Sequence, residues 1–184
     1  MPYMLELDVD SYGFLVGGDD RLQVNPAFHS WLLPYPHIPD RLAVSWEPGT
    51  LAVRPNIYAH NLLRDFVADS AAFDVLARVI DDGFQVYGKM MLDGNELSVV
   101  QATETLDVVD ESLSLMSEFR RDDIAFPHIL EENDTATMNK IFRVPNRGLS
   151  LSVFVGDGVK QAYDEAGLTG WLFHSTRVLP DEWE

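Results

Sequence analysis

The sequence predicts a mixed α+β fold, in which two principal helices pack on one mainly antiparallel sheet. Two observations carry this prediction. A strong hairpin signal covers residues 84–102, and apolar residues recur at helical spacing in residues 71–82 and 157–166. The chain has 184 residues, of which 46% are hydrophobic, so it is long enough to bury a core without disulfides or a metal. We therefore expect a single domain over residues 1–184, patterned more clearly in 70–176 than in 1–69.

Each of the two expected helices has a start signal, an apolar face and a stop signal. Asp69 or Ser70 can cap the first helix, and Gly83 can end it. Asp157 can cap the second helix, and Gly167 can end it. The apolar positions are Ala72, Phe73, Leu76, Val79 and Ile80 in the first helix, and Val159, Ala162, Tyr163 and Ala166 in the second.

The strongest strand signal surrounds Asp93-Gly94, a pair that favours a tight hairpin turn. Period-two alternation predicts a first strand over residues 3–9. Prolines exclude a long helix from residues 26–55, which we expect to be irregular apart from one short strand. The expected strands are residues 3–9, 42–46, 84–92, 97–102, 106–109, 140–144, 149–155 and 168–173.

One further segment has helical spacing. Leu113, Met116 and Phe119 suggest a short amphipathic helix that ends at Arg120-Arg121. The tryptophans Trp31, Trp46 and Trp171 are expected to pack in the core or at its rim, since large aromatic side chains bury the most area.

The charge of the chain limits its partners. It carries 30 acidic and 13 basic residues, for a formal net charge of −17. Nucleic acids and anionic membrane surfaces require basic side chains, so neither is an expected partner. A basic protein would be attracted to such a surface, although the acidity could also serve solubility alone.

Cysteine is absent, which excludes disulfides, thiolate metal sites and cysteine nucleophiles. Residues 1–10 contain no Lys or Arg and no long apolar run, so we expect no signal peptide, and no stretch is apolar enough for a transmembrane helix. These observations favour a cytoplasmic protein.

The sequence shows no motif of a known catalytic centre. The five histidines, His29, His37, His60, His128 and His174, form no H-x-x-x-H pair, and no G-x-S-x-G elbow is present. We therefore predict no catalytic residues, no metal and no cofactor. A site assembled from distant histidines and carboxylates stays open as an alternative.

Two acidic runs are the candidate partner-binding residues. The first contains Asp107, Asp110 and Glu111, and the second contains Glu131, Glu132 and Asp134. Such runs are usually solvated loops, but they also suit the rim of a contact with a basic protein.

The second half of the chain resembles a bacterial family. Three stretches carry the resemblance: Leu97-Ser98-Val99-Val100-Gln101 followed by residues 106–111, the strand Lys140-Ile141-Phe142-Arg143-Val144, and the C-terminal stretch from Val153 through Glu165-Ala166-Gly167-Leu168-Thr169-Gly170 to Phe173. They are similar to motifs of the immunity proteins of polymorphic toxin systems, a family first described as a domain of unknown function. The resemblance covers about residues 70–176.

The resemblance implies that the protein binds and neutralises a cognate toxin in the cytoplasm. It implies no catalytic residues, and it leaves open the identity of the toxin and the oligomeric state. Two other classes of function remain: an enzyme with a dispersed site, and a structural or scaffolding subunit whose acidity is only solvation.

Overall fold

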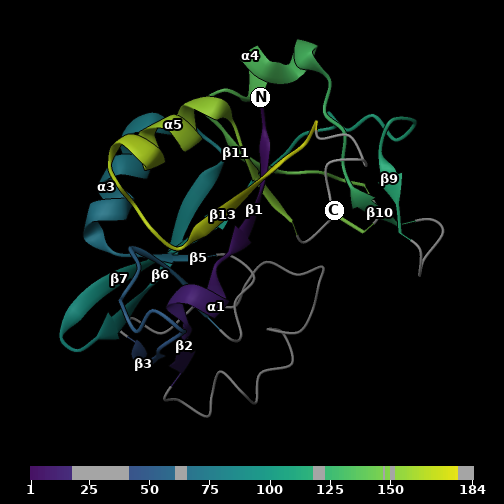
Figure 1. Cartoon of the computed structure of the whole chain (residues 1–184). Helices are drawn as coiled ribbons and strands as arrows, with labels where there is room; N and C mark the ends of the chain where they lie inside the picture. The colour runs from purple at the N-terminus through teal and green to yellow at the C-terminus, as the bar shows by residue number, and fades with distance from the viewer. Residues whose placement is uncertain (18–41, 61–65, 118–122, 147, 150–151, 178–184) are drawn as a thin grey trace.

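The chain adopts an α+β fold, as predicted. The computed structural model describes residues 1–17, 42–60, 66–117, 123–146, 148–149 and 152–177 (Figure 1). Its strands are β1 Tyr3–Leu7, β2 Phe14–Gly17, β3 Leu42–Glu47, β4 Ile57–His60, β5 Phe66–Ala68, β6 Phe84–Leu92, β7 Asn95–Ala102, β8 Glu104–Thr105, β9 Leu115–Met116, β10 Ile124–Phe126, β11 Ile141–Arg143, β12 Val153–Val155 and β13 Trp171–Ser175. Its helices are α1 Val9–Tyr12, α3 Ser70–Val79, the 3-10 helix η2 Glu131–Asn133, α4 Asp134–Thr137 and α5 Asp157–Glu165.

The strands do not form the single sheet that we expected. Strands of the described residues close a barrel in the order β2-β3-β6-β7-β5-β4. Most neighbouring pairs are antiparallel, but β2 runs parallel to β4 and β3 runs parallel to β6. The barrel interior is packed with apolar side chains, including Leu15, Tyr58, Val67, Met90 and Val99.

A second sheet has the order β13-β1-β12-β11-β8. It is antiparallel except where β8 runs parallel to β11. Alternate residues of its strands face opposite sides: Ile141 and Val155 belong to the core shared with the barrel, whereas Phe142 and Phe154 belong to a separate core. Both faces of this sheet are therefore covered.

Helices α3 and α5 pack against each other and cover the first of these faces (Figure 1). The Asp69 carboxylate accepts a hydrogen bond from the amide of Ala72 and caps α3, as the sequence predicted. The helix ends at Val79, three residues before the expected end. The cap of α5 is Gly156 and not Asp157, which is the first helical residue.

Gly156 stands at a point where no side chain fits. A Cβ built on it would lie 1.8 Å from the carbonyl oxygen of Thr137, because the start of α5 is packed directly on the end of α4. Glycine therefore allows close approach of two backbones here.

We call residues 107–134 the acidic lobe. Its described parts, residues 107–117 and 123–134, cover the opposite face of the second sheet. From Asp107 to Asp134 the sequence contains nine acidic residues and two basic ones: Asp107, Asp110, Glu111, Glu118, Asp122, Asp123, Glu131, Glu132 and Asp134, against Arg120 and Arg121. Ile124 and Ile129 of the lobe pack on Phe142 and Phe154 of the sheet. The apolar contact fixes the lobe to the rest of the fold.

Two predictions for this region are wrong. Leu113 and Met116 do not lie in a helix: residues 111–113 form a turn, and residues 115–116 form the short strand β9. Phe119 and the two arginines lie outside the described residues. The expected strand at 106–109 is reduced to one isolated bridge at Val109.

The N-terminal part differs from its prediction in a similar way. The strand predicted over residues 3–9 ends at Leu7, because the Asp8 carboxylate accepts a hydrogen bond from the amide of Ser11 and starts α1. The predicted strand at 42–46 is present as β3. The rest of the proline-containing segment up to residue 41 lies outside the described residues.

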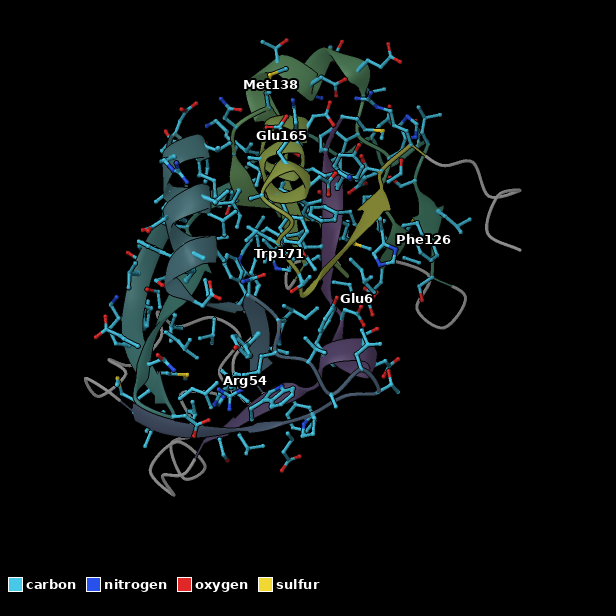
Figure 2. All side chains as sticks on the ribbon, turned by 60° about the vertical axis from the view of Figure 1, so that its left-hand side comes forward. Glu6, Arg54, Phe126, Met138, Glu165 and Trp171 are labelled. Atoms are coloured by element: carbon cyan, nitrogen blue, oxygen red, sulfur yellow. The ribbon has the colours of Figure 1, made fainter. Side chains whose placement is uncertain are left out.

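The tryptophans that the structure describes pack as expected. Trp171, which is labelled in Figure 2, is 5% exposed. It stacks on Tyr163 and meets Phe66 edge-on. Trp46 is half-buried and donates a hydrogen bond from its indole nitrogen to the carbonyl oxygen of Tyr12. Trp31 lies outside the described residues.

Candidate protein-binding surface

One backbone pairing brings the two predicted acidic runs together. Val109 and Ile129 form an isolated antiparallel bridge, and the amide of Asp110 donates to the carbonyl oxygen of His128 at 2.8 Å. In this antiparallel arrangement Asp107 and Glu131 lie two residues from the bridge, toward the same end. The two runs, 24 residues apart in sequence, thus form one region of the surface.

Glu131 and Glu132 of the second run lie on the short helix η2 and are exposed. Neither forms an ion pair with a residue that the structure describes. Their charges are free to act on a molecule outside the chain.

Asp134 differs from Glu131 and Glu132 because its carboxylate is bound by another side chain of the same molecule. Arg177 donates to both carboxylate oxygens of Asp134, one bond measuring 3.0 Å, and its Nε donates to the carbonyl oxygen of Ile129 at 2.7 Å. The hydrogen bonds from Arg177 hold the pKa of the Asp134 carboxyl below its usual range. The main role of Asp134 in this structure is to tie the segment after β13 to the acidic lobe.

The first run shows the same division between free and occupied carboxylates. Asp107 is exposed and forms no ion pair within the described part of the chain. Asp110 accepts hydrogen bonds from the amide and hydroxyl of Ser112 at 2.9 and 2.6 Å, and the hydroxyl bond is the main cause that lowers the pKa of Asp110. Glu111 accepts from the side-chain amide of Asn146 at 2.8 Å.

Exposed apolar side chains lie in the same segment of the chain, and two of them, Leu113 and Met116, belong to the helix that the sequence predicted. Leu113, Leu115, Met116 and Phe126 are 57%, 44%, 41% and 36% exposed. Leu115 and Phe126 are direct cross-strand partners in the two-stranded sheet of β9 and β10. Both figures place this pair of strands on the opposite side of the molecule from α3.

Most basic side chains of the described residues form ion pairs with acidic side chains other than Asp107, Glu131 and Glu132. Five basic residues form these ion pairs: Arg54 with Asp93, Lys89 with Glu96, Lys140 with Glu104 and Asp82, Lys160 with Asp164, and Arg177 with Asp134. Exposed residues such as Asp107, Glu131 and Glu132 therefore contribute to the negative electrostatic potential at the surface.

The described histidines lie on three different parts of the fold. His60 is 4% exposed on the barrel strand β4, and burial lowers its pKa to about 4. His174 lies 2.7 Å from the Glu6 carboxylate on the second sheet, whereas His128 belongs to the acidic lobe. Within the described ranges no three His, Asp or Glu side chains are grouped to hold a metal ion. His29 and His37 lie outside these ranges.

Comparison of the sequence with models of protein families finds no match, and comparison with curated proteins finds none either. The resemblance to immunity proteins therefore stays a prediction. None of the helices in the described residues is long and apolar enough to cross a membrane.

Proposed function

We propose that the protein is an immunity-type inhibitor, which binds a cognate toxin in the cytoplasm and occludes its active site without catalysis of its own. The observation that carries this proposal is the acidic lobe. It presents the unpaired carboxylates of Asp107, Glu131 and Glu132 and, in the same segment of the chain, exposed apolar side chains. Interfaces of inhibitors combine an apolar centre with a polar rim in this way.

The partner that this surface suits is a basic protein. Opposite charge raises the rate of encounter and orients the two molecules before contact. Toxins that cleave or modify nucleic acid need a basic surface for their substrate. An acidic inhibitor bound over that surface would exclude the substrate by occupying the same volume and by matching its charge.

Co-expression tests the proposal. The gene would be expressed beside the reading frame immediately upstream of it, in a host that the upstream product alone kills or arrests. We expect growth to recover and the two proteins to purify as a stable complex. An upstream product that stays toxic and unbound in the presence of this chain would contradict the proposal, and metal analysis of the purified protein would then test the dispersed enzyme site.

A further inference from the structure

We propose that three exposed apolar side chains, Leu115 of β9, Phe126 of β10 and Leu113 just before β9, are the anchors at the centre of the contact with a basic protein partner. This inference rests on the proposed function and names the surface that carries it. The predicted acidic runs supply only the rim. The apolar residues between them supply the part of the contact that determines how long the complex lasts.

Strands β9 and β10 need support from the rest of the fold to hold their exposed apolar residues in a fixed position. A two-stranded sheet is marginally stable in water. Here Ile124, the cross-strand partner of Met116, is 4% exposed and packs in the core beneath the lobe. The buried Ile124 holds β10 from below, so that the exposed pair of Leu115 and Phe126 is fixed before any partner arrives.

Gly148 adds a second constraint beneath the same strand. Its φ is +88°, and a Cβ built on it would lie 2.8 Å from the carbonyl oxygen of Ile124. The backbone of residue 148 therefore packs directly on β10. A surface that is ordered before binding loses less conformational entropy in the complex, which raises its affinity.

The charge of the acidic lobe identifies the occupant. Asp107 lies before the apolar residues in the sequence, and Glu131 and Glu132 lie after them, all within a lobe that has nine acidic and two basic residues. A second copy of the chain would bring two such lobes together, and like charges would repel. A protein surface with Lys and Arg around an apolar hollow satisfies both the charge and the apolar anchors.

Another exposed apolar pair provides a matched control. Leu51 and Val53, in the connection between β3 and β4, are 55% and 58% exposed. The neighbouring Arg54 lies at the barrel, away from Phe126 (Figure 2). The pair is also aliphatic and its exposure is similar to that of Leu113 and Leu115, but it lies in a different part of the surface.

The experiment measures binding of the co-purified upstream product to three forms of the chain: wild type, Leu113→Ser with Leu115→Ser, and Leu51→Ser with Val53→Ser. We expect the lobe variant to weaken Kd at least about 30-fold, mainly through faster dissociation, and the control to change Kd less than about threefold. Thermal unfolding of the variants by circular dichroism checks that both are folded. Hydrogen exchange of the wild-type complex should also show new protection at residues 113–117 and 123–126.

The outcomes separate this inference from the proposed function. If the wild type neither binds nor neutralises the upstream product, both fail together. If the wild type binds while the lobe variant binds equally well, or residues 113–126 gain no protection, the inference is overturned and the inhibitor function stands. Self-association of the wild type at micromolar concentration that the lobe variant abolishes would show that the occupant is a second copy.

Discussion

Val109 pairs with Ile129 in an isolated antiparallel bridge, and this contact joins the two acidic runs of the sequence into one surface. Ile129 is fully buried, so the bridge is anchored in the core beneath the lobe. The position of the exposed carboxylates is thus set by packing of the acidic lobe on the second sheet.

Charge reversal at the rim should slow association with a basic partner. We expect Glu131→Lys with Glu132→Lys to lower the association rate constant on the order of tenfold at low salt and to reduce its dependence on salt. Asp134 is left unchanged because its substitution would also break the ion pair with Arg177. The control, Asp74→Lys with Asp81→Lys, makes the same change in net charge at and just after α3. Stopped-flow measurements that find both variants equally slow would assign the effect to net charge and not to the lobe.

The pairing of Asp134 with Arg177 should contribute to stability. Asp134→Asn removes charged hydrogen bonds in a half-buried site, and we expect a loss of about 1–3 kcal/mol in the free energy of unfolding. Asp93→Asn, in the more exposed pair with Arg54, should cost less than about 0.5 kcal/mol. Urea titrations at pH 7 compare the two variants, and equal effects would contradict the structural role of Asp134.

The same pair gives a prediction for pH. The pKa of Asp134 is lowered in the folded protein, so its contribution is present above the ordinary carboxyl pKa of about 4 and is lost as pH falls below that value. The difference in stability between wild type and Asp134→Asn should therefore shrink from pH 5 to pH 2. A difference that grew on acidification would refute the assigned direction.

His60 should make the folded state sensitive to mild acid. Burial lowers its pKa from 6.5 to about 4, so below pH 6.5 the unfolded chain takes up a proton that the folded chain resists. Stability should fall through the window from pH 6.5 to 4, by about 3 kcal/mol in total. His60→Leu removes this titration and should flatten the pH profile of unfolding in that window. An unchanged profile would show that His60 does not control it.

Gly156 should tolerate no side chain. Gly156→Ala places a methyl group against the carbonyl oxygens of Thr137 and Met138, and we expect a loss of about 3 kcal/mol or more. Gly167 has a φ of +63° with open space around its Cβ position, so Gly167→Ala should cost only about 1–2 kcal/mol of backbone strain. Thermal unfolding distinguishes the two, and a smaller loss at Gly156 would contradict the close packing of α4 on α5.

Local signals in the sequence predicted the local elements well. The hairpin of β6 and β7 formed where Asp93-Gly94 indicated it, and both residues have the positive φ that this turn requires, +49° and +83°. The cap at Asp69 likewise marked the start of α3.

The barrel could not be predicted in the same way. Strands β2, β4 and β5 have three or four residues each, too few to show a period, and β2 pairs with β4 across more than 40 residues of chain. Such pairings depend on the whole fold. The junction of the acidic runs is of this kind, since it depends on one bridge between Val109 and Ile129.

The exposure of Leu113 and Met116 could not be predicted from their spacing in the sequence. Leu113 and Met116 are three residues apart, which fits one face of a helix, and the interpretation as a helix implied that they face the core. The structure exposes them because residues 111–113 form a turn that leads into β9 in place of a helix.

The most direct test of the proposed inhibition is a titration of toxin activity with the purified protein. The upstream product would be assayed for the activity that arrests the host, at a fixed concentration and with increasing amounts of this chain. We predict that activity falls linearly to zero at a fixed molar ratio, because a bound inhibitor occludes each active site. Full activity at a large excess of the folded chain would contradict the account.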